Sequence, residues 1–226
     1  MCGRIANTLP IDAMAQMFEA VPANDLPDVP NYNVCPTTQI SVVVSGNDRR
    51  LISMRWGFIP DWYQSPTDGP LLINARSETL AEKPAFRQAC RQRRCLIPIT
   101  GYYEWTKDTA GQRLPWYFSS VDRAPLVLGG IWQEWGADDP IKTCTIVTTP
   151  ANDVVSNVFH RMPVLLKPED YALWLGEKGK GAARLMRAAP EDALRFFRVH
   201  PQVNSNRAEG SDLIEPFDDD PIKPLF

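Results

Sequence analysis

The sequence predicts an α+β protein built on a bent, mainly antiparallel β-sheet, with short helices at the margins of the sheet. Three observations lead to this fold class. Short apolar or alternating segments recur along the chain, separated by glycine, proline, asparagine and aspartate. The 226 residues include 21 prolines, close to twice the average share, which favours loops and edge strands over long helices. We see neither an internal repeat nor a low-complexity linker, so we expect one domain over residues 1–226.

The first elements are predicted to be a helix and a β-hairpin. Ile11, Met14 and Phe18 repeat at helical spacing and predict an amphipathic helix at 10–20. Prolines between residues 22 and 30 then force an extended connection. Two β-propensity segments flank a Gly-Asn-Asp turn, and these hairpin strands are expected at 39–45 and 50–58.

The rest of the chain is predicted to be strand-rich. Turn residues separate further apolar segments, which we expect to be strands at 71–76, 94–106, 114–120, 125–134, 141–149 and 194–200. Helices are expected at 78–92 with a break near Pro84, from Pro168 through Leu175, and at 181–189. An irregular acidic tail from about residue 217 closes the chain.

Composition excludes several classes of protein. No segment is apolar and long enough to span a bilayer, and the N-terminus does not have the pattern of a signal peptide. Five cysteines without a C-x-x-C motif predict reduced thiols in the cytoplasm. Only two histidines accompany them, so we expect neither a metal nor a cofactor.

A net charge of -3 argues against bulk electrostatic binding of nucleic acid, although arginines cluster at 87–94. Such a cluster is either a phosphate contact or simply a solvated face.

Cys2 carries the most specific chemistry in the sequence. Removal of Met1 would leave an α-amine and a thiol on one residue at the N-terminus. These groups titrate near about 8 and about 8.5, so each is partly nucleophilic at neutral pH. The amine forms a Schiff base with an aldehyde, and the thiol then closes on the imine carbon to give a thiazolidine. The alternative is an arbitrary second residue in a frayed tail.

Other candidate residues each have a structural alternative. Asn74 and Arg76 alternate along a strand and therefore share a face, which also suits a hydrogen-bonded edge. Glu104 lies among aromatic residues, which suits a general acid or base, but a solvated strand carboxylate fits the same residues equally well. His160 is either a proton shuttle or a core histidine. Trp62 and Tyr63 lie in a loop that contains proline and glycine, where they stack on a base or pack on the sheet.

Taken together, these segments resemble a known family. The motifs, in chain order, are Met1-Cys2-Gly3-Arg4, Tyr32-Asn33-Val34-x-Pro36, Arg55-Trp56-Gly57-Phe58-Ile59-Pro60-x-Trp62, Asn74-Ala75-Arg76-x-Glu78-Thr79, Cys95-Leu96-Ile97-Pro98-x-x-Gly101-x-Tyr103-Glu104-Trp105, Arg161-Met162-Pro163, and Val203-Asn204-x-Asn206 leading to Leu213-Ile214-Glu215-Pro216. They are similar to the SRAP family, the SOS-response-associated peptidases, which shield abasic sites. The resemblance covers residues 2 to about 216 and implies a barrel-like, bent antiparallel sheet with flanking helices.

The resemblance also implies roles for individual residues. Cys2 would be the nucleophile that forms a thiazolidine crosslink with an abasic site in single-stranded DNA. Asn74 would orient the opened sugar and the N-terminus, and Glu104 would transfer protons, with His160 as a further catalytic candidate. The implied DNA-binding residues are Arg4, Pro36, Trp62, Tyr63, Arg76 and Arg161.

One position departs from the family pattern, which is usually His-x-Arg-Met-Pro. In this chain the order is Phe159-His160-Arg161-Met162-Pro163, so an ungapped alignment puts Phe159 in the histidine position. Either a shorter loop lets His160 reach the site, or the histidine function is absent. In the second case we expect slower sugar-ring opening and altered crosslink reversal, with crosslinking preserved.

Two other functions compete with covalent capture of DNA. In the first, less favoured alternative, Cys2 is the nucleophile of an N-terminal thiol peptidase or amidohydrolase, whose minimal activity is removal of Met1. A non-covalent reader of damaged or modified DNA is the second alternative. For the favoured function, the expected partner is single-stranded DNA with abasic sites, and we expect a monomer in the cytoplasm that is associated with the nucleoid or replication.

Overall fold

A closed, mixed β-barrel of five strands forms the centre of the protein. The computed structural model describes residues 2–217, so Met1 and most of the predicted acidic tail lie outside the described residues. Four antiparallel pairings connect the barrel strands. A parallel pairing between β5 (Arg49–Trp56) and β11 (Ile141–Pro150) closes the ring. The barrel strands are β4 (Gln39–Val44), β5 (Arg49–Trp56), β7 (Arg94–Ile99), β10 (Leu126–Trp135) and β11 (Ile141–Pro150).

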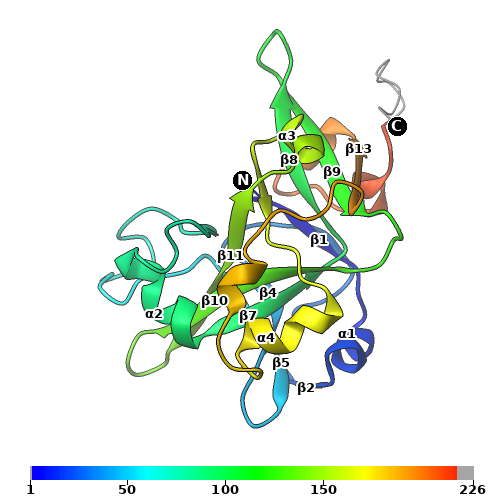
Figure 1. Cartoon of the computed structure of the whole chain (residues 1–226). Helices are drawn as coiled ribbons and strands as arrows, with labels where there is room; N and C mark the ends of the chain where they lie inside the picture. Colours follow the sequence, from blue (N-terminus) through cyan, green and yellow to red (C-terminus); the bar gives the residue numbers. More distant parts are fainter. Residues whose placement is uncertain (1, 218–226) are drawn as a thin grey trace.

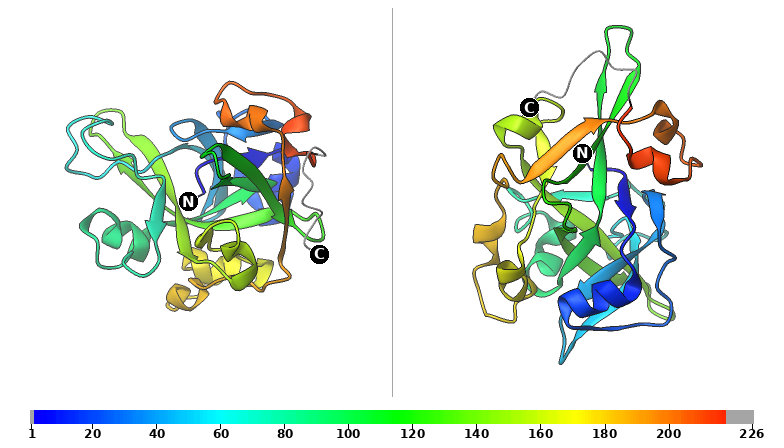
Figure 2. Two further views of the ribbon diagram at one scale, coloured as in Figure 1. Left: turned by 90° about the horizontal axis from the view of Figure 1, so that it is seen from above. Right: turned by 90° about the vertical axis from the view of Figure 1, so that its right-hand side faces the viewer.

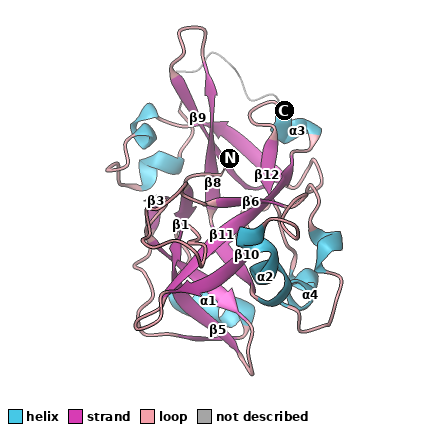
Figure 3. Ribbon diagram, turned by 90° about the vertical axis from the view of Figure 1, so that its left-hand side faces the viewer, coloured by secondary structure: helices cyan, strands magenta, loops and turns pink. Residues whose placement is uncertain are grey.

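Alternation along the barrel strands separates an interior core from an outer one. Val42, Ile97 and Ile146 share one apolar cluster, whereas the alternate residues Val43 and Leu96 belong to another cluster that contains the helix residues. The two clusters are therefore the barrel interior and the layer between barrel and helices. Figure 3 shows this arrangement, with the helices outside the strands.

A second sheet of five strands packs against the barrel. Its strand order is β13 (Leu194–Arg198), β9 (Arg113–Ser120), β8 (Gly101–Lys107), β1 (Ile5–Asn7) and β3 (Asn31–Val34). Tyr102 and Phe118 of this sheet join the cluster that fills the barrel interior. Tyr103 and Tyr117, on the opposite face, pack instead against the C-terminal segment. Figures 1 and 2 show this sheet at the upper end of the barrel.

The strand predicted at 94–106 is in fact two strands in different sheets. At Thr100 the chain leaves the barrel, and the Thr100 N–H donates to Ala6 O at 2.8 Å rather than to a barrel strand. Gly101 permits the crossing, because a Cβ there would lie 2.4 Å from the backbone oxygen of Phe118 and from the ring of Tyr117. Apolar β-propensity continues through this junction, so the sequence pattern does not show it.

The helices are short and lie mainly on the outside of the barrel. They are α1 (Ile11–Phe18), α2 (Pro84–Gln92), α3 (Asp153–Ser156) and α4 (Tyr171–Leu175), with 3₁₀ turns at Pro168–Asp170, Ala182–Leu185, Pro201–Asn204 and Ser211–Ile214. The prediction of a helix over 78–92 is wrong before Pro84, which occupies the first turn of α2. The helix predicted at 181–189 is only a 3₁₀ turn, entered through Gly179 and Gly181 with positive φ.

Three short strands complete the sheets: β2 (Ala20–Pro22), β6 (Asn74–Arg76) and β12 (Arg161–Pro163). The strand predicted at 71–76 is thus shorter than expected, and it pairs in parallel with β11. Three residues are too few to show a period, so two of these strands were not predicted. Within residues 2–217 no helix has the length and apolar character needed to cross a membrane. One domain over the whole chain stays a prediction.

Candidate functional site

Cys2 lies fixed within the fold. Its side chain is 1% exposed and belongs to the barrel-interior cluster. The carbonyl oxygen of Cys2 accepts a hydrogen bond of 2.9 Å from Asn74 Nδ2, and β1 begins three residues later at Ile5. The alternative of a frayed tail is therefore wrong.

Glu104 is a buried carboxyl group next to this N-terminal segment. The Tyr103 N–H donates to Arg4 O at 2.9 Å, which aligns β8 with the residues that follow Cys2. Glu104 is 3% exposed, and burial raises its pKa to about 7. Burial, followed by the negative charge of Glu104, raises the pKa of the Cys2 thiol. At neutral pH the thiol is therefore mainly protonated, and the carboxyl group is divided between its two protonation states.

Asn74 connects β6 to the same site. Its neighbour Ala75 is buried in the outer core, so Asn74 and Arg76 lie on the other face of β6, as the alternation predicts. Asn74 uses Nδ2 to hold Cys2, while its Oδ1 is buried and has no hydrogen-bond partner among residues 2–217. A buried acceptor of this kind is uncommon and is available to a ligand.

Tyr102 is a candidate site residue that sequence analysis did not single out. It lies two residues before Glu104, so the two side chains share a face of β8, and it is fully buried with its ring stacked 4.8 Å from that of Phe118. Burial raises the pKa of Tyr102, with further increases from Cys2 and Glu104, which places its hydroxyl in their electrostatic field. Across the described chain that hydroxyl finds no hydrogen-bond partner. The signal in the sequence was the spacing of Tyr102 and Glu104.

Two of the predicted DNA-binding arginines are buried and already hydrogen-bonded. Arg161 is 6% exposed and forms a two-point ion pair with Glu78 at 2.7 and 2.9 Å. It also donates to Thr148 O at 2.8 Å, and its hydrogen bonds lower the pKa of Glu78 to about 2. This guanidinium group therefore holds β12, β11 and the segment after β6 together.

Arg4 has a similar structural position. It is 7% exposed and donates to Asn33 Oδ1, to Val203 O at 3.0 Å and to Asn206 Oδ1 at 2.7 Å. Its guanidinium carbon also lies 5.9 Å from the centre of the Trp105 ring. Arg4 thus ties the N-terminal segment to the C-terminal motif. Direct contact of Arg4 or Arg161 with DNA stays a prediction.

The remaining predicted DNA-binding residues are more accessible. Arg76 is exposed at the end of β6, and Trp62 is 56% exposed. Tyr63 lies edge-on to Trp62 at 6.3 Å, and its carbonyl oxygen accepts a 3.0 Å hydrogen bond from Trp135 Nε1. The loop is therefore anchored while its Trp62 ring faces solvent. Pro36 is half-buried in the turn between β3 and β4.

His160 is exposed at the start of β12, so it is not a core histidine. Its ring contacts that of Phe159 at 4.4 Å, and its backbone oxygen accepts from the Ala151 N–H at 3.1 Å. Phe159, in the ungapped histidine position, is half-buried. A role for His160 in proton transfer stays a prediction. No cluster of three His, Cys, Asp or Glu residues suited to a metal ion occurs between residues 2 and 217.

The chain is similar to several known proteins. The chain is 32% identical to the Bacillus subtilis abasic site processing protein YoqW over 224 residues, covering 95% of this chain and 99% of the relative. It is 27% identical to YedK of Escherichia coli, also named an abasic site processing protein, over 96% of this chain and all of the relative. A Bacteroides thetaiotaomicron crystal structure superposes with a TM-score of 0.82 at 22% identity, over 96% of this chain and all of that one, and shows the same fold.

The family itself is established by a sequence model that matches residues 1–206, nearly the full length of the chain. The closed barrel, the site around Cys2 and every ordered motif up to Asn206 lie within this matched region, whereas the motif at 213–216 follows it. The protein belongs to the SRAP family, the SOS response associated peptidases.

Proposed function

We propose that this protein acts in the DNA damage response by capturing abasic sites in single-stranded DNA through a covalent bond to Cys2, after removal of Met1. Relatives named abasic site processing proteins support the coarser assignment to DNA at abasic sites. One observation carries the finer assignment. The second residue of the chain is a buried cysteine held by Asn74, beside a carboxyl group whose pKa is about 7.

The first step is formation of an imine. The ring-opened deoxyribose presents an aldehyde at C1′, and the α-amine of Cys2 adds to this carbon. Glu104 protonates the departing oxygen, and one water leaves as the C=N bond forms. A carboxyl group with a pKa of about 7 has both protonation states populated at neutral pH, which suits this exchange. His160 is the second candidate for the proton transfer that opens the sugar.

The second step closes the ring. The Cys2 sulfur adds to the imine carbon, and the thiol proton passes to the nitrogen by way of Glu104, so only the water of the first step is lost overall. The raised pKa of the thiol keeps it protonated until attack, which makes the nearby base necessary. Asn74 fixes the Cys2 carbonyl, so amine and thiol stay on the same side as the incoming aldehyde.

Binding of the DNA strand is assigned to the accessible residues. Arg76 offers an exposed cation on the Asn74 face of β6, and Trp62 offers a solvent-facing ring for base stacking. Arg4 and Arg161 support the site from within, and Pro36 and Tyr63 shape the adjoining loops. A weak, salt-sensitive encounter is sufficient because the covalent step retains the strand.

The test uses single-stranded DNA with one abasic site and a denaturing gel, beside an intact-mass measurement that confirms loss of Met1. We expect a shifted band with the wild-type protein and none with Cys2→Ala. Cys90→Ala is the matched control, because Cys90 lies on α2 in the outer core and not in the cluster that contains Cys2. Absence of the band from processed wild-type protein would reject covalent capture, and turnover of an amide substrate instead would favour the thiol-peptidase alternative.

A further inference from the structure

A cavity of about 280 Å³ lies on the face of the second sheet that points away from Cys2. The cavity and the core around Cys2 lie on opposite faces of β9, because side chains alternate along a strand. Phe118 faces the core that contains Cys2, and its neighbour Tyr117 faces the cavity. The cavity is bounded by β9, β13, the junction at Thr100, the turn before β10 and the C-terminal segment. Its lining comprises Thr100, Tyr117, Ser119, Arg123, Ala124, Arg195, Phe197, Ile214, Glu215 and Pro216.

Two arginines give the cavity its positive charge. Arg195 Nε donates to Ser119 Oγ at 3.0 Å, and its guanidinium carbon lies 5.9 Å from the centre of the Phe197 ring. These contacts hold the base of the side chain and leave its terminal nitrogens available. Arg123 also lines the cavity, and neither arginine has an ion-pair partner within the described part of the chain.

Tyr117 contributes a buried hydroxyl without a partner. The side chain is 2% exposed, and its Oη has no hydrogen-bond partner between residues 2 and 217. Tyr103, on the same face of the sheet, differs: its hydroxyl donates to Tyr32 O at 2.7 Å and lies 3.3 Å from Leu213 O. Burial raises the pKa of Tyr117, Arg195 lowers it and Glu215 raises it, so its hydroxyl lies in the field of both charges.

The donors outnumber the acceptors in this cavity. Ser119 accepts its bond from Arg195 and so retains its own proton, which adds to the Tyr117 hydroxyl and the two guanidinium groups. Among the lining residues that the structure describes, Glu215 is the one carboxylate, and Phe197, Ile214 and Pro216 form an apolar wall. This excess of hydrogen-bond donors favours a ligand that is rich in acceptor oxygens, such as an oxyanion. Planar guanidinium groups bind oxyanions through two hydrogen bonds at once.

We propose that this cavity binds a phosphate monoester of about mononucleotide size, with the phosphate on Arg123, Arg195, Ser119 and Tyr117. The organic part lies against the apolar wall, and Glu215 accepts a hydrogen bond from it. The volume is at the lower end of that of small-molecule sites, which limits the ligand to this size. A free nucleotide and the 5′-phosphate of a DNA end present the same chemistry.

The experiment measures binding of thymidine 5′-monophosphate to the full chain by calorimetry, with thymidine and inorganic phosphate as comparison ligands. We expect the monophosphate to bind more tightly than either. Tyr117→Phe removes only the unpartnered hydroxyl and is expected to weaken binding about tenfold. Arg195→Gln is expected to weaken it at least as much, whereas Glu215→Gln strengthens it about threefold because an opposing charge is lost.

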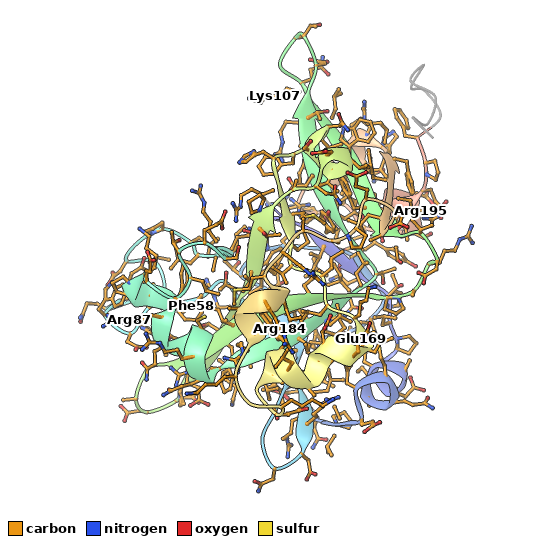
Figure 4. All side chains as sticks on the ribbon, viewed as in Figure 1. Phe58, Arg87, Lys107, Glu169, Arg184 and Arg195 are labelled. Carbon is orange, nitrogen blue, oxygen red and sulfur yellow. The ribbon has the colours of Figure 1, made fainter. Side chains whose placement is uncertain are left out.

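The matched control is Arg184→Gln, an exposed arginine on the turn after α4, which Figure 4 shows far from Arg195. It should leave binding unchanged. A 5′-phosphorylated oligonucleotide that competes with the monophosphate, while its unphosphorylated form does not, would assign the DNA end as a source; failure of both to compete would assign the free nucleotide. The proposal is overturned if the monophosphate does not bind at millimolar concentration, if inorganic phosphate binds equally well, or if Tyr117→Phe and Arg195→Gln leave the affinity unchanged.

Discussion

Replacing Glu104 by glutamine should stabilise the fold while it impairs the chemistry. The carboxyl group is 3% exposed, and burial raises its pKa from 4.5 to about 7. Each tenfold change in proton affinity corresponds to about 1.4 kcal/mol, so the ionised carboxylate costs the folded state about 3 kcal/mol. Glutamine keeps the shape of the side chain and removes the charge, so most of this cost disappears in the variant.

The sign of the pH dependence follows from proton binding. Between pH 4.5 and about 7 the folded state binds more protons at Glu104 than the unfolded state does, so stability falls as pH rises. Below pH 4.5 the wild-type carboxyl is protonated in both states and resembles glutamine. The stabilisation by Glu104→Gln should therefore be close to zero near pH 4.5 and should reach about 3 kcal/mol above pH 7.

Urea unfolding at pH 5 and pH 8 measures this difference, with Glu82→Gln at an exposed carboxylate as the control. The Glu104→Gln variant should also slow crosslinking by about 10²–10⁴-fold, which is the usual contribution of a general acid or base. Two results would refute the assignment of the raised Glu104 pKa to burial. One is a Glu104→Gln protein that is less stable than wild type at pH 8, and the other is a difference in unfolding free energy that is the same at both pH values. Unchanged crosslinking would refute the role in proton transfer.

Three further predictions concern neighbouring residues. Tyr102→Phe should slow crosslinking about tenfold without lowering the midpoint of urea unfolding, because the lost hydroxyl has no partner in the described fold; an unchanged rate would exclude it from the site. Glu78→Gln should destabilise the protein by about 1–3 kcal/mol in urea unfolding, because it leaves the buried Arg161 without its counter-charge, and an unchanged midpoint would contradict this. Arg76→Gln should weaken DNA binding in fluorescence anisotropy and make it less dependent on salt, whereas an unchanged salt slope would show that Arg76 does not contact phosphate.

Local sequence patterns predicted much of the fold because the relevant forces act over a few residues. Alternation identified the hairpin of β4 and β5, and helical spacing identified α1. The junction at Thr100 was missed because the change of sheet depends on long-range partners such as Ala6. The three-residue strands β2 and β12 were missed because their pairing is set by neighbouring strands already in place.

The same distinction applies to the site. Cys2 and Glu104 became candidates through chemistry that is visible locally, a thiol at the chain start and a carboxylate among aromatic residues, and the family resemblance then implied their roles. Sequence shows that Arg4 and Arg161 are charged, but burial and partners distant in the chain, Asn206 and Glu78, hold their side chains inside the fold. Tyr102 was missed because only the packing of the second sheet against the barrel leaves its hydroxyl unpartnered next to Cys2.

Covalent capture as a thiazolidine requires that the amine and the thiol of Cys2 bond to the same carbon of the DNA. Carbon-13 NMR of the crosslink, formed with an abasic site labelled at C1′, observes that carbon directly. We predict a saturated carbon bonded to one nitrogen and one sulfur, together with a mass equal to protein plus DNA less one water. An unsaturated imine carbon in the final product, or a labelled carbon that remains an aldehyde beside processed protein, would contradict the account.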